Sequence, residues 1–431
     1  MRLLYSFSII LYSLLIRFAS LFNKKAKMWL KGRKELFPRM ELELSGDDED
    51  EQLVWFHCAS LGEFEQGRPI IEKLKSIYPE KRILLTFFSP SGYEVRKNYT
   101  GADYIFYLPS DTRANAKKLL DLFKPAAVVF VKYEYWYNYI DEIYTRKIPL
   151  IVVSAIFRKN QHFFLFYGSW FRKQLKKVTY FFVQNKESAG LLNSINIRNA
   201  IVSGDTRFDR VTSIMNKPAS FNDVEQFIQG SIIFIAGSTW NKDYEVLVPL
   251  INRDFNGIKY IIVPHEIKND NINRLIKAIN GKTVRLSDED KSGFAEAQVL
   301  IIDKIGILSH LYQYASVAYI GGGFGKGIHN TLEAAVFGMP VLFGPKYKKF
   351  EEAIEMIKYE TAFCVKSPEE LINETYRLLS NYEVLKETSA ISKEYVRLKK
   401  GATDKVLTFM QALLNTSKSL LRQMQKEISL N

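Results

Sequence analysis

Short apolar runs alternate with segments of helical spacing along most of this chain, and the alternation comes in two series. The first series spans Leu53–Val202 and the second Ser231–Phe343, with the polar segment Thr212–Asn222 between them. Alternation of this kind predicts doubly wound sheets of parallel strands, so we expect an α/β protein of two Rossmann-like domains. The expected strands are Leu53–His57, Arg82–Phe88, Ala126–Val131, Pro149–Ser154, Tyr180–Val183 and Ala200–Val202, then Ser231–Ala236, Lys259–Val263, Val299–Ile302, Val317–Ile320 and Pro340–Phe343.

The polar segment marks the expected domain boundary, because linkers between domains are exposed and often contain proline. We expect an anchor with a basic juxtamembrane segment over residues 1–40, a first domain over 41–215, and a second domain with terminal helices over 216–431. Ligands of such sheets bind at the carboxyl ends of the strands, so the expected site lies in a cleft between the domains. GT-B glycosyltransferases, sugar-nucleotide epimerases and periplasmic binding proteins all fit this plan.

The N-terminus is an apolar run, Leu3–Leu21, which Arg17 interrupts and which a cluster of lysines and arginines follows. A cleaved signal peptide would need small residues at its cleavage site, and bulky Phe18 and Phe22 lie beside the nearest small pair. A core helix of the first domain would show a similar run. The basic cluster favours an uncleaved anchor, shallow or a single span, held at the cytoplasmic face of a membrane. Acidic residues then prevail over residues 41–51.

The overall composition is that of a globular protein, with 47% hydrophobic and 25% charged residues among 431. Its two cysteines, Cys58 and Cys364, lie far apart, so neither a disulfide framework nor a zinc site is expected. The formal net charge of +13 favours an anionic partner, such as a phosphorylated substrate or a phospholipid surface. Nucleic acid is not expected as a partner, because the charge forms no dense stripe of the kind that a duplex needs.

A glycine-rich run that opens a helix is the strongest chemical signal. A buried strand ends just before Gly321–Gly323, which let a backbone approach a ligand closely, and a helix is expected to start near Asn330. The free N–H groups of that helix, with Lys326 before it, can hold a phosphate, and His329 can donate to the same ligand. Glu333 can accept hydrogen bonds from a ribose diol. The spacing differs from the Gly-x-Gly-x-x-Gly loop of NAD sites, and a plain glycine turn before a capped helix is the alternative.

A second signal follows the first expected strand, where the chain leads into a helix with Glu63 in its first turn. Acidic residues there often only complement the helix dipole. The functional interpretation is a general base, because a sugar hydroxyl has a high pKa and a carboxylate must take its proton during displacement at a sugar carbon. Lys132, Glu134 and Arg207 follow expected strands or lie in turns, where they could contact a substrate or transition state. The sequence contains no metal-ligand pattern, so metal is not expected.

Several motifs match one family in order along nearly the whole chain. They are Trp29–Arg33, His57–Phe64, Asp205–Asp209, Ala236–Thr239, Asp303–Leu308, Gly321–Phe324, His329–Glu333 and Gly338–Pro345. Together they resemble the 3-deoxy-D-manno-octulosonic acid (Kdo) transferase family of lipopolysaccharide synthesis. In that family the glutamate of the His-x-Ala-Ser-x-Gly-Glu motif is the proposed catalytic base, and Glu63 stands at that position.

The resemblance implies a GT-B fold and an inverting, metal-independent transfer of Kdo from CMP-Kdo to a lipid A precursor (lipid IVA), the first step of inner-core assembly. It implies acceptor binding by the first domain, CMP-sugar binding by the second, and no cofactor. It also implies a place on the cytoplasmic face of the bacterial inner membrane. The expected donor-binding residues are Ser238, Thr239, His265, Gly322, Gly323, Lys326, His329, Asn330 and Glu333.

Two segments depart from the family's pattern. Its Glu-x-Glu-x-Trp-Pro segment has Lys132 at the first position here and Tyr137 at the last. Its Pro-Arg-His-Pro-Glu-Arg segment is shortened to Pro264–Glu266, without the first arginine, and either Lys268 or Lys346 could replace that cation at the donor phosphate. A sugar-nucleotide 2-epimerase of the same fold is the alternative enzyme, although it leaves the anchor unexplained. A non-enzymatic basic scaffold at a membrane is a further alternative.

Overall fold

The computed structural model describes residues 1–45, 52–253, 255 and 257–415. The acidic residues at 47–51 and the predicted helical continuation after residue 415 lie outside the described residues. The chain divides into two compact units, which are treated separately below. Unit 1 comprises Met1–Arg210 together with the chain from Lys400 onward, and unit 2 is Val211–Lys399.

Unit 1 is built on one parallel sheet, which has seven strands within the described residues, in the order β3-β2-β1-β4-β5-β6-β7. The direction of winding reverses between β1 and β4, which pair side by side. Ligands of doubly wound sheets bind outside the carboxyl ends of the strands at such a reversal. The strands are β1 (Leu53–Cys58), β2 (Arg82–Phe87), β3 (Tyr104–Tyr107), β4 (Ala127–Val131), β5 (Leu150–Ala155), β6 (Tyr180–Val183) and β7 (Ala200–Val202).

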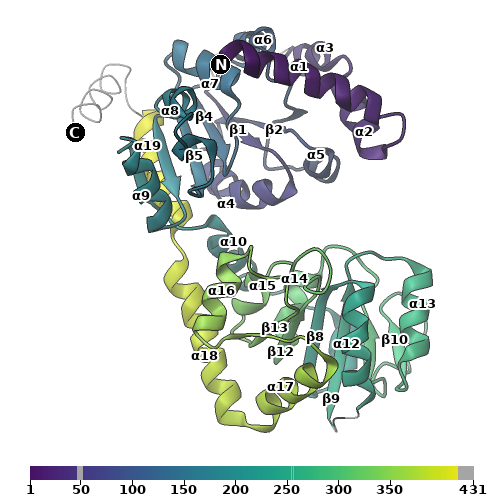
Figure 1. The fold of residues 1–431 in the computed structure, drawn as a ribbon. Helices are drawn as coiled ribbons and strands as arrows, with labels where there is room; N and C mark the ends of the chain where they lie inside the picture. The colour runs from purple at the N-terminus through teal and green to yellow at the C-terminus, as the bar shows by residue number, and fades with distance from the viewer. Residues whose placement is uncertain (46–51, 254, 256, 416–431) are drawn as a thin grey trace. The chain divides into compact units, whose positions relative to one another are not determined.

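Helices cover both faces of this sheet (Figure 1). Trp55 and Val128 belong to one apolar cluster, whereas their neighbours Val54 and Val129 belong to another, as expected when side chains alternate across a buried sheet. The helices of unit 1 are α1 (Arg2–Ala19), α2 (Lys24–Arg33), α3 (Leu36–Leu44), α4 (Leu61–Ile77), α5 (Pro90–Arg96), α6 (Arg113–Phe123), α7 (Tyr137–Thr145), η1 (His162–Phe164), α8 (Ser169–Leu175), α9 (Lys186–Ser194) and α19 (Ala402–Asn415), with α10 (Thr206–Met215) spanning the unit boundary.

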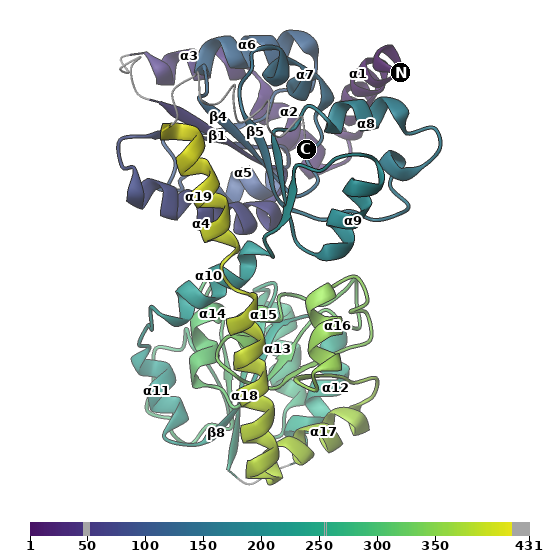
Figure 2. The same ribbon diagram turned by 90° about the vertical axis from the view of Figure 1, so that its left-hand side faces the viewer.

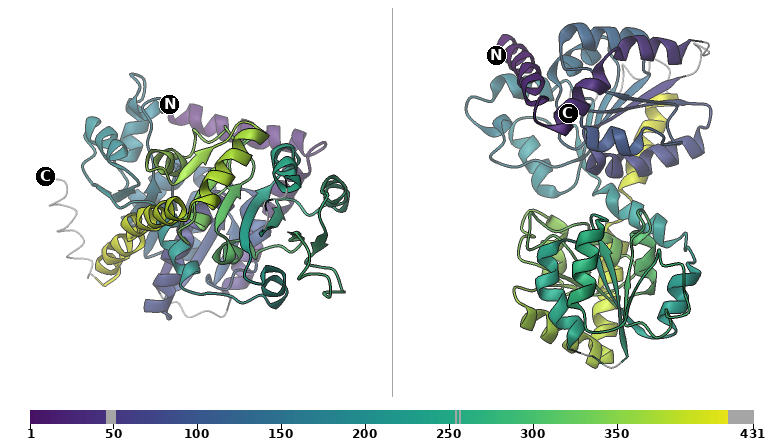
Figure 3. Two further views of the ribbon diagram at one scale, coloured as in Figure 1. Left: turned by 90° about the horizontal axis from the view of Figure 1, so that it is seen from below. Right: turned by 90° about the vertical axis from the view of Figure 1, so that its right-hand side faces the viewer.

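Unit 2 repeats the plan with a second parallel sheet, of seven strands in its described residues, in the order β10-β11-β9-β8-β12-β13-β14. Here the winding reverses between β8 and β12. The two views of Figure 3 show helices around this sheet. The strands are β8 (Ile232–Thr239), β9 (Ile258–Pro264), β10 (Thr283–Arg285), β11 (Val299–Ile301), β12 (Val317–Ile320), β13 (Val341–Phe343) and β14 (Ala362–Cys364).

The helices of unit 2 bury an apolar core of aliphatic and aromatic side chains against the sheet, including Tyr260, Tyr319 and Leu371. They are α11 (Asn222–Ile228), α12 (Asn241–Asn252), α13 (Asn269–Ala278), α14 (Leu308–Leu311), η2 (Tyr312–Tyr314), α15 (Leu332–Ala335), α16 (Glu351–Lys358), α17 (Pro368–Ser380) and α18 (Tyr382–Lys399).

The predicted α/β fold of two Rossmann-like domains is confirmed. Every predicted strand is present within about one residue at each end, except that β8 continues past the predicted end at Ala236 to Thr239. The sequence did not reveal β3, β10 and β14. All three are short strands at sheet edges, and of the edge strands in the described sheets only β7 was predicted.

The observed division of the chain differs from the predicted domains at both ends of the second one. The boundary falls at Arg210–Val211, inside α10, and α19 belongs to unit 1 and not to the second domain. The reason is apolar packing, because Val406, Leu407 and Met410 of α19 lie in the same core cluster as Val54 of β1. Figure 2 shows α19 along the sheet face that α4 also covers.

The N-terminal helix α1 is long and apolar enough to cross a membrane, by length and composition alone. None of its residues is buried. It contacts α2, which in turn packs on α5. The predicted anchor segment is therefore a helix attached to unit 1.

Candidate active site

Glu63 lies in the first turn of α4, just after the carboxyl end of β1. Ser60 caps that helix, because its Oγ accepts a hydrogen bond from the backbone N–H of Gly62 at 3.2 Å. The same hydroxyl donates to Oε2 of Glu63, whose side chain is half-buried. Glu65 instead pairs with Arg96, at 2.9 Å from its guanidinium. Of these two carboxylates, Glu63 is the one held by Ser60 at the strand end.

A buried chain of hydrogen bonds lies beside this turn, around His57. Trp55 donates through Nε1 to Oγ1 of Thr86 at 2.7 Å, and that oxygen lies 2.9 Å from Nδ1 of His57. Nε2 of His57 lies 3.2 Å from Oε2 of Glu134, which also accepts from Nε1 of Trp136 at 2.6 Å. Nδ1 of His57 also lies 3.1 Å from the backbone carbonyl oxygen of Thr86. Glu134 is thus held by donors from within the protein.

Cationic side chains gather after β4 and β5. Lys132 has a φ of 71°, and its Nζ lies 5.2 Å from the ring centre of Tyr133. The guanidinium of Arg158 lies 6.0 Å from the same ring. Burial raises the pKa of Tyr133, and the charges of Arg158 and Arg207 oppose that rise while the charge of Glu63 adds to it. The charges of Arg158, Arg207 and Glu63 therefore all act on the Tyr133 hydroxyl at the carboxyl end of the sheet.

Arg207 sits at the start of α10 and binds Asp205 through two nitrogens, at 2.8 Å and 2.7 Å. Burial acts to raise the pKa of Asp205, but the charge and hydrogen bonds of Arg207 outweigh it and hold the pKa below its ordinary value. Gln66 also donates to Asp205 at 3.0 Å. Arg207 thus keeps a fixed orientation, and part of its charge is already balanced.

Sequence reasoning missed two residues of this half of the site, Tyr133 and Arg158. The signal was present, because Arg158 follows the carboxyl end of β5 just as Lys132 follows that of β4.

In unit 2, the glycine turn after β12 packs against the chain itself. A Cβ on Gly321 would lie 2.4 Å from the carbonyl oxygen of Ser238, and one on Gly323 would lie 2.5 Å from the backbone nitrogen of Gly344. Gly322 has a φ of 92°, and its N–H donates to the buried Asp243 at 2.9 Å. Packing within unit 2 therefore already requires these glycines, apart from any approach of a ligand.

Three rings stack at the carboxyl ends of the central strands of unit 2. Trp240 follows β8, His265 follows β9, and His329 lies in the segment after β12. The ring centres of His265 and His329 are 4.4 Å apart, and those of Trp240 and His265 are 4.5 Å apart. Nε1 of Trp240 donates to Nε2 of His329 at 2.9 Å, so the imidazole's remaining proton belongs on Nδ1.

Burial, together with the charge of His265 acting in the same direction, lowers the pKa of His329 to about 4. Burial also lowers the pKa of His265. Both rings are therefore neutral near pH 7. Trp240 was not among the predicted residues, although it directly follows the predicted pair Ser238 and Thr239.

Ser238 and Thr239 form the end of β8. Ser238 has a φ of 55° and is half-buried, and Thr239 is buried with its Oγ1 donating to Tyr244 at 3.2 Å. The backbone N–H of His265 donates to the carbonyl of Thr239 at 2.9 Å. These bonds fasten the ends of β8 and β9 together.

The helix predicted near Asn330 begins at Leu332 and has four residues. Asn330 accepts from the backbone N–H of Leu332 at 3.1 Å, so one of the free donors expected for a phosphate is already occupied. The amide of Asn330 also donates to Oε1 of Glu333 at 3.1 Å, which orients that carboxylate. Lys326 is exposed, and Nζ of Lys346 donates to the carbonyl of Gly325 at 2.6 Å.

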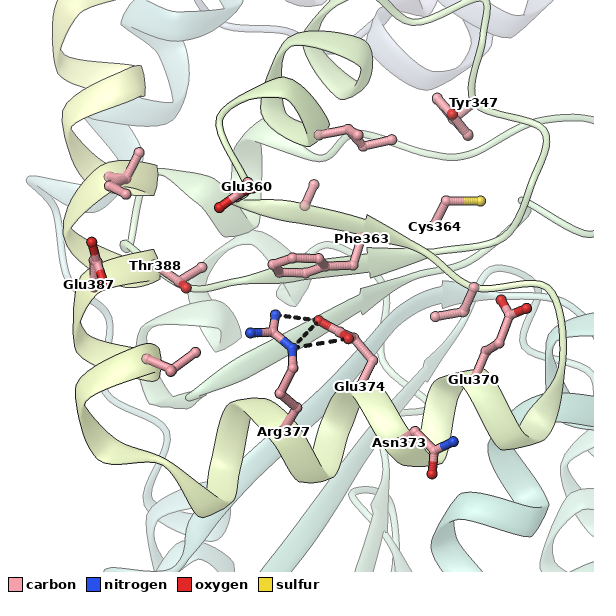
Figure 4. A pocket seen from close by; sticks show the side chains of 15 residues that line it. Tyr347, Glu360, Phe363, Cys364, Glu370, Asn373, Glu374, Arg377, Glu387 and Thr388 are labelled. Atoms are coloured by element: carbon pink, nitrogen blue, oxygen red, sulfur yellow. Dashed lines mark hydrogen bonds and ion pairs between the residues drawn. The ribbon is translucent and has the colours of Figure 1, made fainter.

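Unit 2 also contains a pocket of about 840 Å³ along its edge strand β14 (Figure 4). Its lining includes Glu360, Glu370, Glu374 and Glu387, and Arg377 in it is already paired with Glu374. None of the predicted site residues lines it. Four carboxylates make it unsuited to a phosphate-bearing ligand, so we place the candidate site at the strand ends and not here.

Among the described residues, no group of three or more histidines, cysteines or acidic residues is arranged to hold a metal ion. The candidate site consists of the side chains and backbone groups of two strand-end clusters, one in each unit.

The profile of the family described as 3-Deoxy-D-manno-octulosonic-acid transferase (kdotransferase) matches residues 32–210. A 3-deoxy-D-manno-octulosonic acid transferase from Aquifex aeolicus (strain VF5) is 31% identical over 335 residues, which cover 76% of this chain and 86% of that protein.

Comparison with solved structures shows the fold. UDP-GlcNAc 2-epimerase from Neisseria meningitidis, bound to UDP-GlcNAc, has a TM-score of 0.59 at 16% identity, over 85% of this chain and 100% of that one. A glycosyltransferase from Rickettsia africae ESF-5 has a TM-score of 0.56 at 14% identity, over 85% of this chain and 100% of that one. The fold is thus GT-B-like, and it does not by itself distinguish an epimerase from a transferase.

Proposed function

This chain belongs to the 3-deoxy-D-manno-octulosonic-acid (Kdo) transferase family, and we propose that it transfers Kdo from CMP-Kdo to the lipid A precursor lipid IVA. Membership of the family makes it a glycosyltransferase. The observation that carries the proposal is the placement of Glu63, a half-buried carboxylate held by Ser60 at the carboxyl end of β1. This turn lies within the residues that the family profile covers.

In the proposed reaction, Glu63 is the general base. A hydroxyl oxygen of the acceptor attacks the anomeric carbon of Kdo while its proton passes to the carboxylate. The bond from that carbon to the phosphate oxygen of CMP breaks, and the electron pair stays with the phosphate. Attack from the side opposite the leaving group inverts the configuration. Ser60 occupies Oε2 of Glu63, which leaves Oε1 to take the proton.

The donor's place in this proposal is the strand-end cluster of unit 2. Glu333, oriented by Asn330, would accept hydrogen bonds from the ribose, and neutral His329 would donate from Nδ1. The exposed Lys326 offers a charge to the phosphate. The other proposed donor-binding residues form the glycine turn and the strand ends. They are Ser238, Thr239, His265, Gly322 and Gly323.

The acceptor's place is the cluster of unit 1. Lipid A precursors carry phosphates, and Lys132, Arg158 and Arg207 supply positive charge around Tyr133. Glu134 would help to position its neighbours and would not transfer a proton, because Trp136 and His57 already donate to its carboxylate.

The proposed location follows from the acceptor, which is a lipid. We place the enzyme on the cytoplasmic face of the bacterial inner membrane, with the exposed apolar α1 as its N-terminal anchor. Donor and acceptor are the expected partners, and nucleic acid is not.

A transfer assay tests the proposed function. Purified full-length protein is incubated with CMP-Kdo and lipid IVA, and the products are analysed by mass spectrometry. We expect lipid IVA to gain the mass of at least one Kdo, with CMP released in equal amount. A folded protein that gives no such product would overturn the proposal. The epimerase alternative is tested in parallel with UDP-GlcNAc alone, where we expect no new sugar nucleotide.

A further inference from the structure

The helix α1 has two faces that differ in burial. Its half-buried residues recur at helical spacing, as Tyr5, Ile9, Ser13 and Ile16 do, and form the face toward unit 1. The opposite face, which we call the outer face, is made of large apolar side chains that are 45% to 85% exposed. These are Leu3, Leu4, Phe7, Ile10, Leu11, Leu14, Leu15 and Phe18. A contiguous apolar stripe that points away from a folded unit indicates a surface that another apolar phase covers.

The first half of α1 is fastened to unit 1 by polar groups as well as by rings. The hydroxyl of Tyr5 donates to the buried carboxylate of Asp111, and its ring lies 4.8 Å from that of Tyr137 in an edge-on arrangement. Arg2 pairs with Asp141 at 3.2 Å. These bonds hold the N-terminal end of the helix on the loop before α6 and on α7.

The second half is fastened through Tyr12. Its ring lies 6.3 Å from that of Trp29 and 6.1 Å from that of Phe88. Arg33 secures this group, because its guanidinium lies 3.8 Å from the centre of the Trp29 ring and donates to the carbonyls of Phe88 and Leu108, each at 2.9 Å. The helix is therefore attached to the rest of unit 1 at points between Arg2 and Tyr12.

This attachment is incompatible with a helix that crosses a bilayer. A crossing helix would be surrounded by lipid, so Tyr5, Tyr12 and Arg2 would have to leave their partners or draw Asp111 and Asp141 into hydrocarbon. Carboxylates and irregular backbone do not enter that region unless other protein covers them. With the contacts kept, only the outer face can meet lipid.

The next helix adds positive charge. Lys24, Lys27 and Lys31 fall on one face of α2 and are exposed, while Trp29 on the opposite face is buried. In the part of the chain that the structure describes, none of these three lysines forms an ion pair. An apolar stripe followed by a basic one is complementary to an anionic lipid surface.

A second apolar element lies near the N-terminal end of α1. Phe166 is 95% exposed and Tyr167 51% exposed, in the loop before α8. The ring of Trp170 in α8 lies 6.0 Å from that of Tyr5, and Figure 2 shows α8 close to α1.

We propose that α1 lies in the plane of an anionic membrane, docked on unit 1, with its outer face and Phe166 in the interfacial layer and the α2 lysines on the headgroups. The occupant of this surface is lipid, and the N-terminus stays on the same side of the membrane as unit 1. The proposal rests on the contacts of α1 and not on the proposed transfer reaction.

Vesicle flotation tests the surface. Full-length protein is mixed with phosphatidylcholine vesicles, with or without phosphatidylglycerol and without any sugar donor or glycolipid. We expect flotation with the anionic vesicles, and at least about a tenfold loss of the bound fraction for Leu15→Glu, because a charge then faces the acyl layer. Leu398→Glu is the matched control, since Leu398 is 68% exposed on unit 2 and Leu15 is 58% exposed on α1. Equal binding by all three proteins would overturn the proposal, and no outcome depends on transfer activity.

Protease access tests whether α1 lies flat or crosses. An N-terminal epitope tag is added, and spheroplasts of an expressing bacterium are treated with protease from outside. We expect the tag to stay intact until the cells are lysed, as unit 1 does. Removal of the tag in intact spheroplasts, with unit 1 protected, would show a crossing helix and overturn the proposal.

Discussion

The hydroxyl of Ser60 makes two hydrogen bonds: it caps α4 by accepting from Gly62, and it donates to the carboxylate of Glu63. Both hydrogen bonds follow from the short turn that joins β1 to α4, because this turn places a serine and a glutamate three residues apart at the strand end. The proposed base is therefore positioned by local geometry.

Replacement of the proposed base tests this geometry. We expect Glu63→Gln to lower kcat by at least about 100-fold, because the amide cannot accept the proton of the acceptor hydroxyl. Steady-state kinetics with lipid IVA measures the loss, and circular dichroism checks the fold. Glu65→Gln is the matched control on the same helix and should retain most of the activity, since Glu65 pairs with Arg96. A Glu63→Gln enzyme with near-normal kcat would refute the assignment.

The ring stack of unit 2 offers a test without substrates. Burial keeps the pKa of His329 near 4, so removal of the covering ring by Trp240→Ala should raise that pKa toward the ordinary 6.5. NMR titration of the imidazole protons measures the shift. His162, which lies in unit 1, is the internal control and should titrate unchanged. A His329 signal that still titrates near pH 4 would mean that the stack does not determine its charge.

At the scale of elements, Asp111 joins three segments. Its carboxylate accepts from Tyr5 of α1 and from the backbone N–H groups of Asn138 and Tyr139 in α7, at 3.2 Å and 3.1 Å. Burial nevertheless raises its pKa from 3.8 to about 6, against the effect of these hydrogen bonds. The folded protein therefore holds a proton on Asp111 in a pH range where the unfolded chain has lost it.

The raised pKa of Asp111 determines how the stability of the folded protein changes with pH. The contribution of Asp111 to stability is fully present below about pH 4 and is lost as the pH rises through about 6. The unfolding free energy of the native protein minus that of Asp111→Asn should thus fall by roughly 3 kcal/mol, as an upper figure, from about pH 3 to about pH 7. Urea unfolding followed by tryptophan fluorescence measures it. A difference that stays constant or grows with pH would contradict the prediction.

The strands found from sequence and those missed differ chiefly in their place in the sheet. Central strands such as β4 are buried throughout and stand out as continuous apolar runs, whereas the edge strands β3, β10 and β14 are short. An edge strand is fixed by pairing with a single neighbouring strand, and this pairing is not visible in the local pattern of the sequence. The start of α15 was predicted near Asn330 and lies at Leu332, whose backbone N–H donates to the side chain of Asn330.

At the scale of the whole molecule, the chain returns to unit 1 after completing unit 2. Val406, Leu407 and Met410 of α19 are buried in the core of the first sheet. Unit 1 therefore depends on residues that are far away in the sequence.

Met410→Ala tests this dependence. We expect a loss of about 2–5 kcal/mol in the stability of unit 1, because the buried side chain leaves a cavity. Hydrogen exchange with mass spectrometry should show faster exchange in β1 and α4 and unchanged exchange in β8 and β12. Leu398→Ala, on the exposed side of α18, is the control and should change stability by less than about 0.5 kcal/mol. Faster exchange in unit 2 alone would contradict the assignment of α19.

The sequence by itself determined the two α/β series, the strand-end positions of Glu63 and Gly321–Gly323, and the family. Those features are encoded locally, by apolar runs and by motifs that are contiguous along the chain. Only the tertiary structure decided that α19 packs in unit 1, that Trp240 donates a hydrogen bond to His329, and which face of α1 is left exposed. Each of these depends on contacts between residues far apart in the sequence, and no local pattern specifies which distant surface a helix or a ring will meet.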